Sequence, residues 1–417
     1  MTELMEKILS RENMMQAYKK VKAKNGASGV DGIRTEEIRE YLIGNWEEIR
    51  EKIKKRKYKP QPVLRVEIPK PNGGTRNLGI PSVVDRIIEQ AIVQVITPTV
   101  EPYFSEYSYG FRPKRSAQQA VLKLLEYFND GYLYVVDIDL EKFFDNVPQD
   151  KLMTLVGKII QDPDTESLIA KYLKAGVMVK GRYEETTKGT PQGGNLSPLL
   201  SNIMLNELDK ELEARNLHFI RYADDCVIVV KSSAAASRVM HTVTNWIERK
   251  LGLKVNASKT KVTKPSHLKY LGFGFVKMGD KWQARPHADS LAKFKRTLKR
   301  LTSRSWGISM DERIQRLNWV IRGWINYFRI GKMKTNMQKI DERLRTRMRI
   351  VIWKQWKTSA KRYWGLRKLG APEWMAKQSV GFRDHYQAVA KTTGLHKISK
   401  EILAKRGLVS CLDYYLN

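Results

Sequence analysis

The chain has 417 residues with 76 Lys and Arg against 44 Asp and Glu, and its formal net charge of +32 predicts a polyanionic partner, because cations that contact phosphates release condensed counterions. No apolar run approaches the roughly 18 residues that span a bilayer, the first 20 residues lack the apolar block of a secretory signal, and two cysteines are too few for a disulfide framework or a Cys-based zinc site. We therefore expect a cytoplasmic, bacterial-type intracellular protein that binds nucleic acid and uses neither a membrane nor a small-molecule redox cofactor.

Helix and strand patterns alternate through the first two thirds of the chain. The spacing of apolar residues predicts helices within residues 1–60, 81–95, 116–128, a mixed stretch up to about 175, and 198–212. Strands are predicted at residues 64–69 and 75–80 around a glycine turn, at 134–140, and at 217–220 and 227–230. Antiparallel hairpins among helices favour an α+β fold over a doubly wound sheet.

The strand predicted at residues 134–140 carries two carboxylates on one side. Because side chains alternate between the faces of a strand, Asp137 and Asp139 point the same way, opposite the apolar Val136, Ile138 and Leu140. Two acids on one face of a strongly β-prone strand need a physical reason, and a shared metal ion supplies one.

A second pair of acids, Asp224 and Asp225, lies in the turn predicted between residues 217–220 and 227–230. Adjacent carboxylates repel each other unless a cation or strong donors lie beside them. A solvated turn is the ordinary explanation of such a pair. Together with the acids of residues 134–140, however, the turn indicates a Mg²⁺ site for phosphoryl transfer, since Mg²⁺ prefers carboxylates and substrate phosphates.

After residue 286 the pattern becomes almost purely helical. One continuous apolar stripe at steps of three and four residues contains Ile314, Leu317, Ile321, Trp324 and Phe328. The last third, from residue 285, holds 31 of the 76 basic residues but 9 of the 44 acidic ones, and seven of the ten tryptophans. A solvated helix face is the alternative, but this density of charge with aromatic side chains favours a nucleic-acid-binding surface.

Several segments in a fixed order carry a resemblance to a known family. They are residues 109–113 (Tyr-Gly-Phe-Arg-Pro), the strand with Asp139, residues 189–198 (Gly-Thr-Pro-Gln-Gly-Gly-Asn-Leu-Ser-Pro), residues 222–225 (Tyr-Ala-Asp-Asp), residues 270–273 (Tyr-Leu-Gly-Phe) and residues 321–328. Together they resemble the fingers, palm and thumb of a group II intron reverse transcriptase. The sequence lacks the paired cysteines of a zinc-containing HNH nuclease domain, and in this respect it resembles the class C members of the family.

The resemblance implies a right-hand polymerase fold with an antiparallel palm sheet. Its parts would be residues 1–130 as N-terminal extension and fingers, interleaved with the palm; 131–284 as palm with the catalytic site; 285–360 as the helical thumb, or maturase X domain; and 361–417 as a small basic DNA-binding segment.

The resemblance also implies the catalytic residues. Asp139, Asp224 and Asp225 would hold two Mg²⁺ ions, with the backbone carbonyl of Leu140 as a further ligand. Members of the family place an aromatic gate against the ribose 2′-hydroxyl five residues after the strand acid. Phe144 stands five residues after Asp139, so Asp139 is the expected ligand, and Asp137, like Asp145, is expected to be structural.

Two further groups of residues follow from the family pattern. Residues expected at the incoming nucleotide are Lys70, Arg76, Phe144, Gln192, Gly193, Gly194 and Tyr222. Residues expected to contact primer, template or intron RNA are Arg112, Tyr270, Gly272, Arg322, Arg343, Arg345, Arg347 and Arg349. Simpler alternatives remain: Lys70 and Arg76 as surface charges, Arg112 as a salt bridge that pins its loop, and residues 270–275 as an ordinary core hairpin.

The function that the resemblance implies is RNA-directed DNA synthesis. The protein would extend a DNA primer 3′-hydroxyl with dNTPs on an RNA template. It would also bind group II intron RNA to assist splicing as a maturase, and act on target DNA in retrohoming. A retron or diversity-generating reverse transcriptase is one alternative, which the thumb helix and basic tail disfavour. A splicing factor with an inactive polymerase site is another, which the presence of all three acids disfavours.

Overall fold

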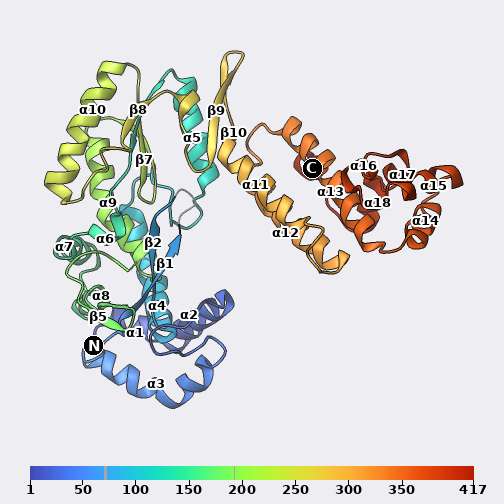
Figure 1. Cartoon of the computed structure of the whole chain (residues 1–417). Coiled ribbons are helices and arrows are strands. Elements are labelled where there is room, and N and C mark those ends of the chain that lie inside the picture. Colours follow the sequence, from blue (N-terminus) through green and yellow to red (C-terminus); the bar gives the residue numbers. More distant parts are fainter. Residues whose placement is uncertain (70–72, 192) are drawn as a thin grey trace. The chain divides into compact units, whose positions relative to one another are not determined.

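The computed structural model describes residues 1–69, 73–191 and 193–417 (Figure 1). Its contacts divide the chain into two compact units, Met1–Lys264 and Pro265–Asn417, which are described separately below. In the parts of the chain that the structure describes, no helix is both long and apolar enough to cross a membrane. The four domains expected from the sequence remain a prediction, since the two units are defined by contacts alone.

The first unit begins with three helices, two of which are capped at their start by a side chain. They are α1 (Glu3–Ile8), α2 (Arg11–Lys24) and α3 (Ile38–Lys54), and the first two begin after Thr2 and Ser10, whose side chains accept a backbone N–H. Helix α4 (Val83–Val100) packs against α2, and the Asn13 side chain donates to the Ala91 carbonyl between them. These helices confirm the predictions for residues 1–60 and 81–95.

A four-stranded sheet in the order β2-β1-β4-β5 follows in the first unit. Strands β1 (Val63–Pro69) and β2 (Thr75–Ile80) form the predicted antiparallel hairpin, in which Leu64 pairs with Ile80. Strand β4 (Val177–Val179) pairs with β1 in parallel and with β5 (Arg182–Glu184) in antiparallel. The sequence did not predict β4 and β5, because runs of three residues are too short to show periodicity.

The second sheet of this unit has the order β6-β7-β3-β8 and is antiparallel throughout. Its strands are β6 (His218–Tyr222), β7 (Asp225–Val230), β3 (Tyr134–Ile138) and β8 (Lys261–Thr263). Successive residues Val135 and Val136 point to opposite faces and both are fully buried, so helices or loops cover both faces of β3. The other elements of the unit are η1 (Glu101–Tyr103), α5 (Ala117–Asn129), α6 (Phe143–Asn146), α7 (Gln149–Ile160), α8 (Pro163–Leu173), α9 (Ser197–Ala214), α10 (Ser233–Trp246) and the short π-helix η2 (Ile247–Leu251).

The second unit is a β-hairpin followed by helices. After η3 (Pro265–His267), β9 (Phe273–Met278) pairs with β10 (Lys281–Pro286). The helices are α11 (Ala288–Leu301), α12 (Met310–Phe328), α13 (Lys334–Gln355), α14 (Ser359–Lys368), α15 (Glu373–Gly381), α16 (Tyr386–Val389), α17 (Thr393–His396), α18 (Lys400–Lys405) and α19 (Cys411–Leu416). The predicted apolar stripe of α12 is buried at Ile314, Leu317, Ile321 and Phe328, and Trp324 stacks on Phe294 of α11 at 4.3 Å between ring centroids.

The α+β class predicted from the sequence is therefore confirmed: two sheets dominated by antiparallel pairs stand in the first unit, and the rest of the second unit after its hairpin is helical. The end of the chain is fixed to the helices of the second unit by a buried carboxylate. Asp341 of α13 accepts hydrogen bonds from the Ser410 hydroxyl at 2.8 Å and from the Cys411 and Leu412 amides at 2.8 and 2.9 Å.

Candidate active site

Two of the predicted catalytic acids lie at the tight turn between β6 and β7. Tyr222 pairs with Asp225 across the end of the hairpin, so Ala223 and Asp224 form the turn. The backbone of Ala223 has φ +57°, a left-handed conformation that suits a two-residue hairpin turn. The predicted hairpin is confirmed, and its turn presents both acids at one end of the sheet.

The sheet register brings Asp139 beside this turn. In the antiparallel pair of β3 and β7, Ile138 lies opposite Cys226, so the residue after β3, Asp139, comes next to Asp225. The Asp139 amide donates to the Thr260 hydroxyl at 3.1 Å, and the Asp139 carbonyl accepts the Asn256 amide at 2.8 Å. Backbone bonds to the segment before β8 therefore fix the third acid.

The charges of the acids act on one another. The pKa of Asp225 is raised to about 6. The larger cause is partial desolvation of its carboxylate by the surrounding protein, and the smaller is repulsion by the charges of Asp224, Asp137 and Asp139. Burial likewise raises the pKa of Asp224, and the charge of Asp139 adds to that rise. This mutual effect agrees with the sheet register, which places Asp139 and the turn at the same end of the sheet.

Two cations lie within electrostatic range of the acids. The positive charge of Arg76 from β2 lowers the pKa of Asp224, although less than burial raises it. The Lys259 ammonium lies 3.4 Å from an Asp139 carboxylate oxygen. Arg76 was predicted at the nucleotide, and the structure places it beside the acids; Lys259 was missed, because a lysine between strands has no distinctive sequence pattern.

The donor set fits a hard divalent cation by its chemistry. Among the described residues, no three His, Cys, Asp or Glu side chains are arranged as a complete metal-binding group. Mg²⁺ in phosphoryl-transfer sites takes only one or two protein carboxylates and fills its shell with water and substrate phosphates. The mutual repulsion of Asp139, Asp224 and Asp225 is the strain that such a cation would relieve.

A buried ion pair that the sequence did not reveal supports the turn. Arg221, the last residue but one of β6, binds Asp209 of α9 through two hydrogen bonds of 2.7 and 2.6 Å, and both side chains are fully buried. The same guanidinium donates to the Ala223 carbonyl at 2.9 Å. Gly110, from the predicted motif 109–113, packs so closely that a Cβ would overlap the Ala223 amide.

The loop after residue 188 is fixed by β2 and α4. The Gly79 carbonyl of β2 comes so near to Gly193 (φ +128°) that a side chain there would overlap it. Glu89 of α4 is buried and accepts the Asn195 amide at 2.6 Å beside Gly194. Close packing therefore explains why glycines stand at positions 193 and 194, in addition to the predicted contact with a nucleotide. The predicted Lys70 and Gln192 lie outside the described residues.

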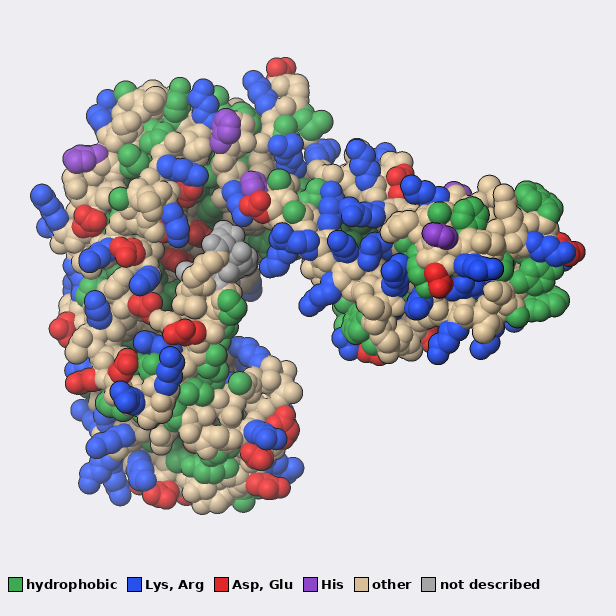
Figure 2. Space-filling model, in the orientation of Figure 1, with side chains coloured by type: hydrophobic (Ala, Val, Ile, Leu, Met, Phe, Trp, Pro, Cys, Tyr) green, Lys and Arg blue, Asp and Glu red, His purple; other side chains and the backbone are tan. Residues whose placement is uncertain are grey.

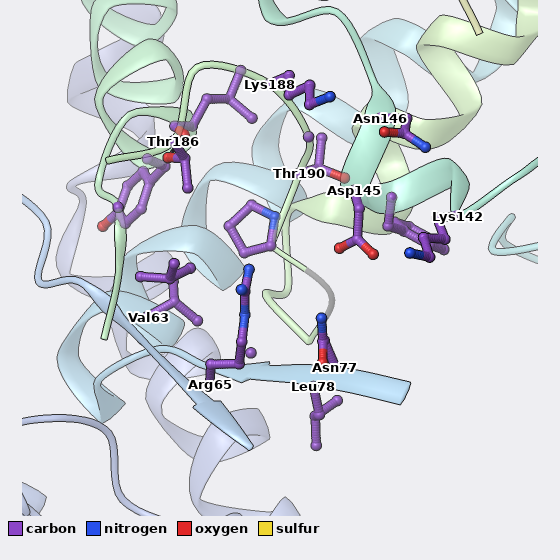
Figure 3. A pocket seen from close by; sticks show the side chains of 18 residues that line it. Val63, Arg65, Asn77, Leu78, Lys142, Asp145, Asn146, Thr186, Lys188 and Thr190 are labelled. Carbon is purple, nitrogen blue, oxygen red and sulfur yellow. Dashed lines mark hydrogen bonds between the residues drawn. The ribbon is translucent and has the colours of Figure 1, made fainter. Parts of the chain in front are cut away.

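A cavity of about 300 Å³ adjoins this loop and the predicted gate residue (Figure 3). Phe144 of α6 is half-buried and lines it together with Pro191. Arg65 and Asn77 point into the cavity from β1 and β2, and Asp145 points into it from α6. The cavity is therefore bounded by β1 and β2 on one side and by α6 and residues 189–191 on the other.

The structure gives several predicted nucleic-acid ligands intramolecular partners. Arg112 is buried, forms an ion pair of 2.8 Å with Glu101 and donates to the Ser105 and Ser108 carbonyls, which supports the loop-pinning alternative. Tyr270 is buried at a tight turn, and the Gly272 carbonyl accepts the His287 amide and the Ser290 hydroxyl.

The basic residues of the second unit fall into two groups. Arg347 donates to Thr302 and to the Lys299 carbonyl at the end of α11, and Arg349 donates to the Ile398 carbonyl. Arg343 is exposed, Arg345 is half-buried, and the exposed Arg322 lies 6.0 Å from the Tyr414 ring. Lys and Arg side chains are dense over these helices (Figure 2), so this surface as a whole is cationic.

An antiparallel sheet with two acids at a hairpin turn and a third acid just after the neighbouring strand is the arrangement of a polymerase-type nucleotidyltransferase. Comparison with known proteins gives the same class. Residues 68–275 match the family model described as reverse transcriptase (RNA-dependent DNA polymerase), and residues 291–370 match the group II intron, maturase-specific domain. The chain belongs to the family of group II intron-encoded reverse transcriptases and maturases.

Two curated relatives show the extent of the similarity. The chain is 33% identical over 289 residues to protein YkfC of Escherichia coli, a match that covers 60% of this chain and 74% of YkfC. It is 36% identical over 228 residues to the group II intron-encoded protein LtrA of Lactococcus lactis, which covers 53% of this chain and 37% of LtrA. The chain thus spans most of one relative and little more than a third of the other.

Proposed function

We propose that this protein synthesises DNA on an RNA template, extending a primer 3′-hydroxyl with dNTPs at the site formed by Asp139, Asp224 and Asp225. The observation that carries the proposal is the sheet register that brings these three residues to the same end of β6, β7 and β3, within a segment that matches the reverse transcriptase model. An RNA-binding protein with an inactive site has no need to keep three mutually repelling acids together.

The side chains of the site have distinct proposed roles. Asp139, Asp224 and Asp225 hold two Mg²⁺ ions, with the Leu140 carbonyl as a further ligand, and bound Mg²⁺ supplies charge stabilisation at the attacking and leaving oxygens. Arg76 of β2 contributes a cation for the triphosphate, and Lys70 is proposed to contribute a second one. Phe144 excludes the ribose 2′-hydroxyl, and Tyr222 stacks beside the primer end.

We further propose that the second unit binds group II intron RNA, assists its splicing, and contributes to target-DNA binding in retrohoming. The match to the maturase-specific domain and the excess of basic residues after residue 284 support this role. A substrate of this kind, together with dNTPs, suits the cytoplasm of a bacterial-type cell.

Primer extension on an RNA template with Mg²⁺ tests the polymerase proposal. We expect the wild type to incorporate dNTPs and Asp139→Asn to lose activity by a factor of about 10³ or more, since a missing ligand removes transition-state charge stabilisation. Asp137→Asn is the matched control on the same strand face and keeps most activity. A wild type without dNTP incorporation, or a larger loss in Asp137→Asn than in Asp139→Asn, contradicts the assignment.

Salt dependence of RNA binding tests the basic surface of α13. We expect Arg343→Gln with Arg345→Gln to reduce the slope of log affinity against log salt by about one per lost phosphate contact. The matched control is Arg347→Gln with Arg349→Gln on the same helix, because those guanidinium groups bind backbone carbonyls. An equal reduction in both pairs contradicts this choice of surface.

A further inference from the structure

The gate segment around Phe144 is held by the chain that leads into the 189–198 loop. The Phe144 carbonyl accepts the Thr190 amide at 2.6 Å, and the Val147 carbonyl accepts the Gly189 amide at 2.7 Å. Pro148 and Lys188 form an isolated β-bridge next to these bonds. The position of the gate backbone therefore depends on the position of Gly189 and Thr190.

One side chain in turn fixes Gly189. Gln149, the first residue of α7, is 4% exposed, and its amide donates to the Gly189 carbonyl at 3.0 Å and to the Leu173 carbonyl at 2.9 Å. These two hydrogen bonds from one buried amide group connect the chain at Gly189 to the end of α8. We propose that Gln149 is a positioning residue for sugar selection, which holds Phe144 in place through Gly189 and Thr190.

The cavity explains why hydrogen bonds carry this task. Phe144, Gly189 and Leu173 all line the 300 Å³ space of Figure 3, so close packing does not support the gate segment from that side. Helix α6 has only four residues, which is too short to be stable by itself. Removal of the Gln149 bonds leaves the segment free to move into the cavity.

The consequence concerns the choice between deoxyribose and ribose. A steric gate excludes a 2′-hydroxyl only while its ring is held within a fraction of an ångström, and a displacement of about 1 Å at a reacting site can change rates by about 10²-fold. A looser Phe144 admits ribonucleotides more readily and leaves deoxynucleotides largely unaffected. This inference rests on the proposed polymerase function and on the gate role of Phe144.

The test compares Gln149→Met with Thr186→Val. Methionine has about the length of glutamine but no donor, so both bonds are lost. Thr186 donates to the same Leu173 carbonyl at 3.0 Å but has no such bond to Gly189, which makes its valine variant the matched control. We expect Gln149→Met to lower the ratio of kcat/KM for dNTP over rNTP by about tenfold, mainly through a lower KM for rNTP, and Thr186→Val to leave the ratio unchanged.

A double-variant cycle shows whether Gln149 acts through the gate. If it does, adding Gln149→Met to Phe144→Ala causes no further loss of discrimination, because coupled residues are not additive. Additive losses, or equal effects of Gln149→Met and Thr186→Val, overturn the proposal. If the wild type itself does not incorporate dNTPs, the polymerase proposal is wrong, and the role of Gln149 in sugar selection is overturned with it.

Gly189→Ala provides a second route if Gln149→Met does not fold, as a thermal melt would reveal. Gly189 has φ +87°, and a Cβ there would stand 2.8 Å from the Phe144 carbonyl oxygen and 2.9 Å from that of Asp145. The methyl group pushes the gate directly, so we expect the same loss of discrimination. Unchanged discrimination in a folded Gly189→Ala variant overturns the link between this strand and the gate.

Discussion

Arg221 and Asp209 form a fully buried ion pair directly beneath the turn that carries Asp224 and Asp225. The guanidinium uses two nitrogens for the carboxylate and the third, Nη1, for the Ala223 carbonyl and the Asn202 side chain. Asn202 donates in turn to the Gly110 carbonyl at 2.8 Å. A single charged network thus connects α9, the Gly110 segment and the catalytic turn.

Breaking this pair from one side is expected to be costly. Asp209→Asn leaves the Arg221 charge buried without a counter-ion, which destabilises by about 3–5 kcal/mol. We expect a lower midpoint of urea unfolding and loss of primer extension, because the Ala223 carbonyl loses its fixed donor.

Glu211→Gln is the control on the same helix. Glu211 pairs with Arg215 at 2.6 Å, but both side chains remain about 30% exposed, and such pairs contribute about 0.5 kcal/mol. Equal destabilisation by the two substitutions would show that the buried pair has no special role.

The crowding of carboxylates at the site predicts a trade between stability and function. Asp225→Asn removes one charge that Asp224, Asp137 and Asp139 repel. We expect the melting temperature of the metal-free protein to rise by about 2–4 °C, while primer extension is lost. Added MgCl₂ should raise the melting temperature of the wild type more than that of Asp225→Asn, since only a cation that binds the folded state stabilises it.

Asp145→Asn is the control for this effect, because Asp145 is an exposed acid close to Phe144 that does not belong to the three proposed ligands. Its melting temperature and its response to MgCl₂ should match those of the wild type. A fall in stability for metal-free Asp225→Asn would mean that the acids do not repel one another in the folded protein.

The sequence predicted those features of the site that depend on neighbouring residues, and not those that depend on residues far apart in the chain. Strand alternation placed Asp137 and Asp139 on one side, and the apolar runs around Asp224 located the hairpin, because both signals are local. The Arg221–Asp209 pair was not predictable, since a charged residue in a strand normally indicates a solvent-facing position and its partner lies 12 residues earlier on a helix.

The role of Gln149 could not be predicted from the sequence for the same reason. Its importance depends on two carbonyls, of Leu173 and Gly189, that are 24 and 40 residues away. Backbone acceptors of this kind cannot be recognised from residue type, whereas Phe144 was predicted as the gate from its spacing to Asp139 in the family pattern.

The docking of the C-terminal helix on α13 is expected to depend on Asp341. Asp341→Ala leaves the buried Cys411 amide and the partly buried Leu412 amide without an acceptor, and an unsatisfied buried donor costs about 1–3 kcal/mol. Hydrogen exchange of residues 410–417 should accelerate by at least tenfold, in line with a loss of about 1.4 kcal/mol or more.

Asp413→Ala supplies the comparison within the same helix. Asp413 pairs with Lys400 at 2.6 Å on the surface, where both side chains are 42–50% exposed, so its removal should change exchange only slightly. If the two variants accelerate exchange equally, the buried carboxylate does not anchor the helix.

Glu89 predicts a pH dependence of stability away from the catalytic acids. The pKa of this carboxyl is raised from 4.5 to about 8, first by burial and then by the charge of Asp85, although the Asn195 and Leu196 amides oppose the rise. Between these two values the folded chain holds a proton that the unfolded chain has lost. The stabilisation is therefore complete below about pH 4.5 and disappears as the pH rises through about 8.

Glu89→Gln cannot ionise, so its melting temperature should fall less steeply between pH 5 and 8.5 than that of the wild type. The exposed Glu40→Gln on α3 should follow the wild type, and parallel curves for Glu89→Gln and the wild type would mean that Glu89 is ionised in the folded protein throughout this range.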